Sequence, residues 1–400
     1  MCRLLALLVL LALVPHGLAA QTLPSGPVTA FDGRLSVGAE VAATFGAEDH
    51  IAYFNYTDYE HNTLRMFRIA LAAAWRPATR IELVGEVRSE DFDHIRPYAA
   101  FVRLRPWPAH AFDVQVGRIP PSFGAYGRRA YQSDNGFIGY PLAYQYLTSL
   151  RPDAIPATVA DLLVMRGRGW QSSFPVGSQE PGPGVPLVSA FRWDTGVQAH
   201  WEGHNVDVTG RVTAGTLAAP RARDDNDGKQ LSGRVAVRPA VGLVLGASAA
   251  RGAFLANDVL ALLPDPEMPH AQTAFAADGE YSRDHWLVRG ELIWSRWNMP
   301  LLTPQTNEDL DALAGWIEGR YRITPRIVAA ARFDRLAFSD VQAGAGVVRT
   351  WEAGVRRYEA DAGYYLQRNL LLRVAVQHND RSGGRVRSRT YVSGQIAYWF

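Results

Sequence analysis

The fold is decided at the end of the chain, where residues 389–400 read RTYVSGQIAYWF. One parity of this stretch is apolar or small, and the other is mostly polar. The first set is Thr390, Val392, Gly394, Ile396, Tyr398 and Phe400, and the second is Arg389, Tyr391, Ser393, Gln395, Ala397 and Trp399. Successive side chains of a β-strand point to opposite faces, so this period of two predicts a strand with one apolar and one polar face.

The same alternation recurs along the chain, for example in 81–88, 98–105 and 370–377. Most of these stretches are about 9 to 13 residues long, enough to cross a bilayer when tilted, whereas strands of soluble sheets usually have about 5 or 6. Sixteen strands are expected. They start near Arg34, Thr63, Arg80, Ile95, Ala111, Val188, His204, Lys229, Val241, Thr273, His285, Ala312, Arg326, Val348, Asn369 and Arg387.

Short and long connections alternate between these strands. Glu202-Gly203 and Thr324-Pro325 are examples of short ones, and 46–62, 119–187 and 252–272 are examples of long ones. Short turns at one rim and long loops at the other are typical of a transmembrane antiparallel β-barrel, with the short turns in the periplasm. The sequence therefore predicts an all-β barrel of about 16 strands with both termini at the periplasmic rim.

Aromatic residues near the expected strand ends fit the interfacial girdles of such a barrel, although filling of the lumen is an equal alternative. They are Trp75, Trp107, Trp201, Tyr281, Trp286, Trp297, Tyr321 and Trp351. One segment departs from the pattern. Around Arg356-Arg357 the alternation shifts phase, which predicts either a β-bulge or a different strand boundary.

The first twenty residues have the three parts of a secretory signal peptide. Arg3 gives a positive start, 4–14 are apolar, and the small residues around Ala19 offer a cleavage site. We expect residues 1–20 to be removed and 21–400 to form the barrel. The single cysteine, Cys2, lies in the leader, so the mature chain has no disulfide and no cysteine nucleophile.

The charge of the mature chain is nearly balanced, with 40 basic and 39 acidic residues once Arg3 is removed. Such a balance argues against a nucleic-acid partner. His200 and His204 have the spacing of a helical metal site but lie on expected strands, where this spacing does not align ligands. We expect no metal, no cofactor and no catalytic residue.

The last strand, with Tyr398 and Phe400, resembles the aromatic-ended final strand of outer-membrane proteins. That resemblance implies recognition by the barrel-insertion machinery. In size, strand number and loop order, the whole mature chain resembles a general porin. The resemblance implies a protein in the lipid of a Gram-negative outer membrane that passes small hydrophilic solutes passively and can form a homotrimer.

A weaker resemblance is to the phosphate-selective porin O and P family, through 116–124, VGRIPPSFG. That family has a proline directly before Phe-Gly, whereas Ser122 intervenes here. Its lysine-rich anion path has no counterpart, because Lys229 is the only lysine. Phosphate selectivity is therefore not carried over.

The connection 119–187 is the third long loop, and in general porins the third loop folds into the lumen. Our hypothesis is that loop arginines face acidic groups of the wall across a constriction and favour anionic or polar solutes. The candidates are Arg118, Arg128, Arg129 and Arg151, with Arg103, Arg105, Arg320, Arg322, Glu82, Glu86 and Asp113 on the wall. The alternative is that the loop arginines are solvated or only hold the loop in place.

Aromatic residues in 137–146 could form a stacking track for sugars, but packing of the loop against the wall is the simpler expectation. Two other functions stay open. A non-conducting barrel would act as an adhesin or structural protein, and a barrel enzyme would need a nucleophile beside one of the scattered histidines.

Overall fold

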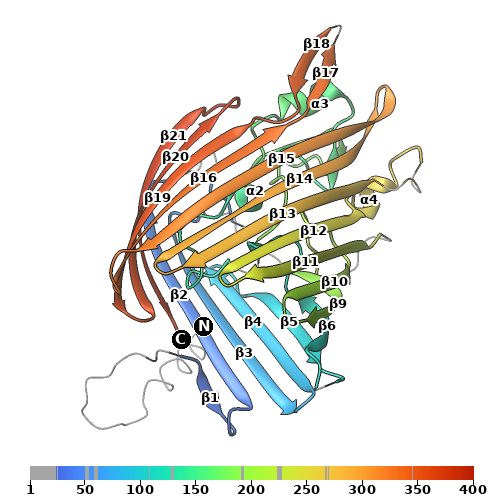
Figure 1. Ribbon diagram of the computed structural model, residues 1–400. Coiled ribbons are helices and arrows are strands. Elements are labelled where there is room, and N and C mark those ends of the chain that lie inside the picture. Colours follow the sequence, from blue (N-terminus) through green and yellow to red (C-terminus); the bar gives the residue numbers. More distant parts are fainter. Residues whose placement is uncertain are drawn as a thin grey trace.

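The barrel is evident in a computed structural model of the chain (Figure 1). The structure describes residues 24, 26–49, 54–57, 62–107, 109–127, 130–190, 193–222, 228–265, 268, 270–344 and 346–400. The expected signal peptide lies outside these residues. Among the described residues, no helix is both long and apolar enough to cross a membrane.

Sixteen strands form the wall, as the alternation predicted. They are β2 Leu35–Gly46, β3 Met66–Ala78, β4 Ile81–Glu90, β5 Arg96–Leu104, β6 Phe112–Ile119, β9 Asp194–Glu202, β10 Val206–Thr213, β11 Gln230–Ala240, β12 Leu243–Ala253, β13 Ala271–Arg283, β14 Trp286–Leu302, β15 Gln305–Arg322, β16 Ile327–Phe338, β19 Val355–Gln367, β20 Leu370–Arg381 and β21 Ser388–Trp399.

Each wall strand pairs antiparallel with its neighbours, and β2 pairs with β21 to close the ring. Closure satisfies the backbone of every strand without leaving an edge, which a sheet inside lipid requires. The short strand β1, Val28–Ala30, pairs with the first residues of β2. It extends the sheet at the rim where β2 begins and the C-terminus lies (Figure 1).

Two expected strand starts were wrong for the same reason. The segment at Val188 belongs to a long loop, and β9 begins only at Asp194. The segment at Val348 belongs to a separate hairpin, β17 Asp340–Gly344 and β18 Val347–Thr350, which stands above the rim in Figure 1. Alternation also occurs in half-exposed hairpins and loops, so it does not by itself distinguish them from wall strands.

The phase shift at Arg356-Arg357 is resolved by the boundary of β19. The strand starts at Val355 and pairs with β16 without a bulge, so that Arg357 faces the lumen and Arg356 the outside. The side chain of Arg357 is fully buried, whereas that of Arg356 is exposed.

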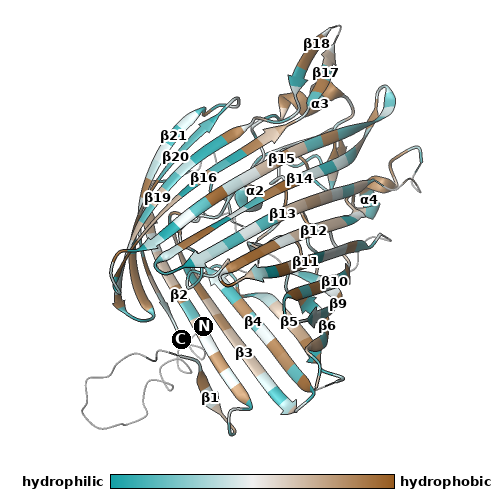
Figure 2. Ribbon diagram, viewed as in Figure 1, coloured by the Kyte–Doolittle hydropathy of each residue, from teal (hydrophilic) through white to brown (hydrophobic). Residues whose placement is uncertain are grey.

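Outward and inward side chains differ as the sequence predicted, and hydropathy alternates along the strands in Figure 2. Val392 and Ile396 of β21 are exposed, whereas Ser393 and Gln395 are buried inside the barrel. Because the outer surface is apolar and the sheet is closed, the chain is a transmembrane barrel of the outer-membrane type.

Most of the expected girdle residues are exposed. They are Trp75, Trp107, Trp201, Tyr281, Trp286 and Tyr321. Trp297 and Trp351 are completely buried and contact each other edge to face, with ring centroids 6.0 Å apart. These two tryptophans fill space inside the barrel, as the alternative reading held.

Candidate functional site: the lumen and its inner loop

A long segment of the chain folds into the lumen. Residues 120–193, here called the lumen loop, connect β6 to β9. The loop contains two short helices, α2 Leu142–Gln145 and α3 Val159–Val164, and a small sheet of β7 Ala154–Ile155 and β8 Val176–Gly177. Figure 1 shows α2 inside the ring of strands. Most side chains of 130–156 are buried, so this part of the loop is a packed structure and not a solvated excursion.

The loop packs through its aromatic residues. The ring of Tyr126 lies 5.0 Å from that of Tyr144 and 5.8 Å from that of Trp316 on β15, measured between centroids. Phe137, Tyr140 and Tyr146 are also almost fully buried. Rings buried against each other and the wall offer no free face for a sugar, which favours the packing role over a stacking track.

Five wall arginines hold the loop by its backbone. The guanidinium of Arg373 on β20 donates to the carbonyl oxygens of Gln132, Asn135 and Phe137 at 2.6 to 3.0 Å, and to the Gln132 side chain at 3.1 Å. The other four donate to loop carbonyls at 2.9 to 3.3 Å: Arg211 to Pro120, Arg289 to Asp134, Arg332 to Gly139 and Arg357 to Tyr140. Bonds to charged donors are stronger than neutral ones, so these arginines are the main polar anchors of the loop.

Three wall carboxylates hold the same loop from other strands. Glu40 on β2 accepts from the backbone N–H groups of Gln132 and Ser133 at 3.0 and 3.1 Å. Glu86 on β4 accepts from the Tyr131 hydroxyl at 2.7 Å. Glu291 on β14 accepts from the Ala125 N–H and the Tyr144 hydroxyl. The loop is thus anchored on opposite sides of the barrel.

Gly124 allows the close approach at Glu291. Its φ is +70°, and a Cβ there would overlap the Glu291 carboxylate and the Tyr144 hydroxyl. Only glycine fits a position that is both left-handed and crowded. This explains the glycine of the SFG sequence, 122–124, in terms of loop docking.

Toward the short turns, several inward charged side chains are less buried than those around the loop. We call this part of the lumen the vestibule and define it by Glu82, Arg103, Asp113, Arg320 and Arg322, together with Arg105. Arg103 donates to Glu82 at 2.7 Å and lies 3.7 Å from Asp113, which is also 3.5 Å from His200. The side chain of Arg103 is 27% exposed and that of Asp113 is 16% exposed, so water reaches both.

The positive charge of the vestibule is only partly neutralised. Among the residues that the structure describes, Arg105, Arg320 and Arg322 form no ion pair. The vestibule carboxylates Glu82 and Asp113 both lie within ion-pair distance of Arg103. A surplus of arginine therefore faces the water at this level.

Comparison with known proteins agrees on the architecture. No model of a known protein family matches the chain, and no curated protein sequence matches it either. Solved structures do match. The outer membrane channel DcaP of Acinetobacter baumannii aligns over 94% of this chain and 100% of its own, at 11% identity and a TM-score of 0.55.

Two further structures agree. OmpF of Salmonella typhi, solved with daunomycin, aligns over 92% of this chain and 97% of its own, at 12% identity and a TM-score of 0.54. An anion-selective porin from Comamonas acidovorans covers 92% and 99%, at 7% identity and a TM-score of 0.53. The chain has the porin fold. At these identities, the similarity describes the fold alone.

Among the predicted constriction arginines that the structure describes, Arg151 and Arg118 are placed differently from the hypothesis. Arg151 is buried, and its guanidinium bonds within the lumen loop, to Asp153 at 2.7 Å and to the carbonyl oxygens of Ser172 and Glu180. Arg128 and Arg129 lie outside the described residues. Arg118 falls on the same parity of β6 as Val114 and Val116, opposite to the inward Asp113 and Gln115.

None of the five anchoring arginines was among the site candidates predicted from the sequence, and Arg289, Arg332 and Arg357 show which signal was missed. A usable signal was present, because each of them shares its strand parity with inward carboxylates such as Glu291, Asp334 and Glu359. Arg357 was harder to predict because the alternation shifts phase beside it.

The predicted assembly signal closes the barrel at its periplasmic end. The backbone of Phe400 exchanges two hydrogen bonds with Ala39, both of 3.0 Å, and the Tyr398 hydroxyl donates to the carbonyl oxygen of Pro24 at 2.8 Å. Its role in insertion stays a prediction. Within the described residues, no group of three or more His, Cys, Asp or Glu side chains could hold a metal ion.

Proposed function

We propose that the protein is a passive outer-membrane channel for small hydrophilic solutes, with a preference for anions. The observation that carries this proposal is the vestibule, where Arg105, Arg320 and Arg322 lack carboxylate partners among the described residues. Rings of unpaired arginine attract anions into an aqueous pore and repel cations. The charged, partly exposed wall supports a water-filled path.

The lumen loop narrows the space through which solutes can pass. Its anchors run from β2 through β14 to β20, so solutes must pass between the loop and the wall or wait for the loop to move. We therefore expect a low conductance with discrete steps and no requirement for a cofactor.

The test is single-channel recording of the refolded protein in planar bilayers, with the reversal potential measured under a salt gradient. We expect discrete steps and a reversal potential of the anion-selective sign. The double variant Arg320→Gln/Arg322→Gln should keep the steps and lose most of the selectivity. Cation selectivity in the unaltered protein, or an unchanged reversal potential in the variant, would contradict the proposal.

A non-conducting barrel is the second candidate, because the loop bonds to the wall on several sides. Such a barrel would serve as an adhesin or structural protein. It predicts silence in bilayers even when the loop is shortened by replacing 126–146 with a short flexible linker. A channel predicts large steps from the same variant.

The proposal also covers the oligomeric state and catalysis. A homotrimer of the porin type is expected, and the mass of the detergent-solubilised protein tests it. Catalysis is not expected, because His200 lies 3.5 Å from Asp113 and, among the described residues, forms no hydrogen bond with a serine or threonine hydroxyl that could act as nucleophile.

A further inference from the structure

Two arginines face the lipid side of the barrel next to each other. Arg335 on β16 and Arg356 on β19 are directly opposite in the antiparallel register, and both are exposed. Their strand neighbours Asp334 and Arg357 point inward and are buried. Phe333 and Tyr358, on the same outer parity, are in contact with ring centroids 5.2 Å apart. We call Arg335 and Arg356 the arginine pair.

This placement is unfavourable for the protein alone. Like charges directly opposite each other on neighbouring strands repel. Arginine on the lipid face of a barrel also costs free energy, falling from about 2–4 kcal/mol at the midplane to about 0–1 near the interfaces. Among the described residues, neither member of the arginine pair forms an ion pair or hydrogen bond through its side chain. Asp380 is in register with Arg356 on β20 but forms no ion pair with it.

The arginine pair lies toward the extracellular side of the apolar belt. Arg335 follows Ile327, the first residue of β16, by eight positions, and Arg356 precedes the outward Tyr364 by the same number. Eight residues span about 26 Å along a strand, or about 20 Å along the membrane normal at a tilt of about 40°. The apolar band of such barrels is about 25 Å tall, so these long side chains reach the outer headgroups.

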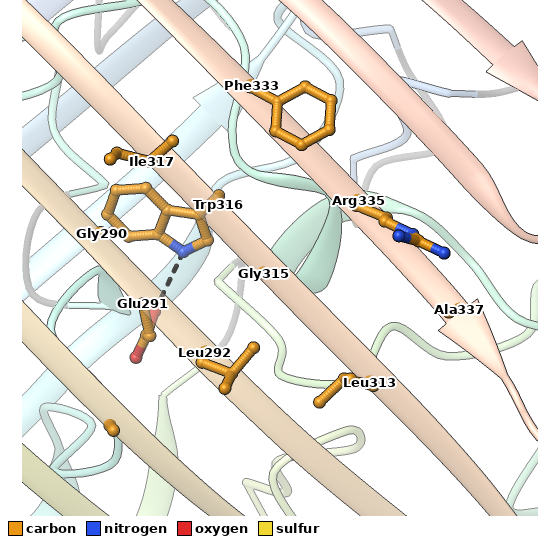
Figure 3. Close-up of a pocket in the computed structure, with 11 residues that line it drawn as sticks. Gly290, Glu291, Leu292, Leu313, Gly315, Trp316, Ile317, Phe333, Arg335 and Ala337 are labelled. Carbon is orange, nitrogen blue, oxygen red and sulfur yellow. Dashed lines mark hydrogen bonds between the residues drawn. The ribbon is translucent and has the colours of Figure 1, made fainter.

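Two hollows adjoin the arginine pair. One, of about 300 Å³, is lined by Arg335, Arg356 and Asp380. The other, of about 670 Å³, is shown in Figure 3, with Arg335 at its edge. Its lining is otherwise mainly apolar and includes Leu292, Leu313, Ile317 and Phe333, and Gly290 and Gly315 leave space between these side chains. An acyl chain suits the larger hollow and a charged headgroup suits the smaller one.

We propose that Arg335 and Arg356 bind a phosphate group of a glycolipid in the outer leaflet, with one of its acyl chains in the hollow of Figure 3. Guanidinium groups bind phosphate through paired N–H donors, and one phosphate between two arginines removes their mutual repulsion. The larger hollow accounts for the lipid part of the ligand, and the arginine pair for its charge. This site lies on the outside of the barrel, so it does not depend on conduction.

Arg251 provides a matched control within the same chain. It lies on the outer parity of β12, eight positions after Leu243, and borders a hollow of about 730 Å³. Its register partners are Leu231 and Thr273 instead of a second arginine. Height, exposure and neighbouring hollow are therefore similar, and the paired guanidinium is absent.

The experiment measures binding of bis-phosphorylated lipid A to the full-length refolded barrel, by native mass spectrometry in a neutral detergent. We expect Arg335→Gln/Arg356→Gln to weaken this binding about tenfold or more, since two charge-assisted contacts are lost. Arg251→Gln should change it less than about threefold, because a single arginine makes fewer such contacts. Lipid A with both phosphates removed should bind weakly to all three proteins.

Heat-modifiable gel mobility confirms that each variant is folded, and outward substitutions on a closed barrel should not disturb it. Equal binding by the double variant and the unaltered protein would overturn the proposal. So would an equal loss in Arg251→Gln, which would indicate a general effect of positive charge, or equal affinity for the dephosphorylated lipid, which would assign binding to the acyl chains alone.

Discussion

The middle of the lumen and the vestibule below it are built from the same residue types, arginine and glutamate, yet these side chains bind different partners. In the middle, Arg373 and Glu40 bond to the backbone of the lumen loop. In the vestibule, Arg103 pairs with Glu82 along the wall, and Arg320 and Arg322 have no ion pair among the described residues. Inward charges thus bond to the lumen loop where the loop lies against the wall, and stay partly exposed in the vestibule, where it does not.

This difference follows from what a buried ion needs. An arginine removed from water must have its donors satisfied, and backbone carbonyl oxygens do so without adding charge. An arginine that keeps its water has no such need, so its field remains available to a solute. Under the proposed function, the lumen loop in the middle narrows the path and the vestibule selects ions.

The largest expected effect comes from releasing the loop in the middle of the lumen. Arg373→Met keeps the length of the side chain and removes four hydrogen bonds to the loop. Bonds to charged groups are worth about 1.5–3 kcal/mol each, so loop docking should weaken by several kcal/mol. We expect single-channel conductance to rise at least about threefold, because loop positions away from the wall become populated.

Arg322→Met is the matched control from the vestibule. It also removes an inward arginine, but the described residues give it no bond to the loop. We expect its conductance to stay near that of the unaltered protein while anion preference falls. Equal conductance in both variants would show that the loop does not limit flow, and the contrast between the two levels would fail.

The sequence predicts the wall strands of the barrel better than it predicts the lumen loop. Alternation predicted the number of wall strands, because a bilayer imposes period two on every one of them. It placed β15 late, at Ala312 instead of Gln305, because the upper part of that strand extends beyond the apolar belt. The predicted strand starts at Val188 and Val348 were wrong, because residues of a loop and of a separate hairpin also alternate there.

The position of the lumen loop could be predicted from the sequence, but the contacts that hold it could not. The sequence pointed to loop arginines facing wall carboxylates, whereas the structure has wall arginines facing loop carbonyl oxygens. Every residue carries a carbonyl, so no residue type marks the acceptor. The partner of a buried arginine therefore becomes visible only when the path of the loop is known.

A smaller effect is expected at the extracellular end of the loop. Glu352, before β19, accepts from the backbone N–H groups of Ser149 at 2.8 Å and of Gly167 at 2.6 Å. Glu352→Ala leaves these buried donors unpaired, at about 1–3 kcal/mol each. We expect amide hydrogen exchange at Ser149 and Gly167 to accelerate about 10-fold to 100-fold, with less change in conductance than Arg373→Met causes.

Asp340→Ala is the comparison for that variant, because Asp340 is an exposed carboxylate on the nearby β17 hairpin. The amide hydrogen exchange of Asp340→Ala at Ser149 and Gly167 should match that of the unaltered protein. If Glu352→Ala opened the channel as much as Arg373→Met, the outer and middle anchors would act as one unit, and the lumen would have no distinct middle level.

The smallest expected effect is a dependence on pH at the extracellular end, outside both levels of the lumen. Burial raises the pKa of Asp49, which follows β2, from 3.8 to about 6. Its carboxyl accepts from the Tyr391 hydroxyl and from the Asn55 N–H at 3.1 Å. Since the folded pKa is raised, the contribution of Asp49 to stability is complete below about pH 4 and is lost as pH rises through about 6.

A rise of the Asp49 pKa from 3.8 to about 6 corresponds to at most about 3 kcal/mol of stability, and structural relaxation reduces this free energy. We therefore expect the Asn55 amide, after correction for intrinsic exchange rates, to be protected up to about tenfold better at pH 5 than at pH 7.5. Asp49→Asn cannot ionise and should show equal protection at both pH values. If the variant kept the pH dependence, another group would be responsible. If conductance followed the same titration, the pH response would reach the lumen loop, and the separation of the extracellular end from the middle level would have to be abandoned.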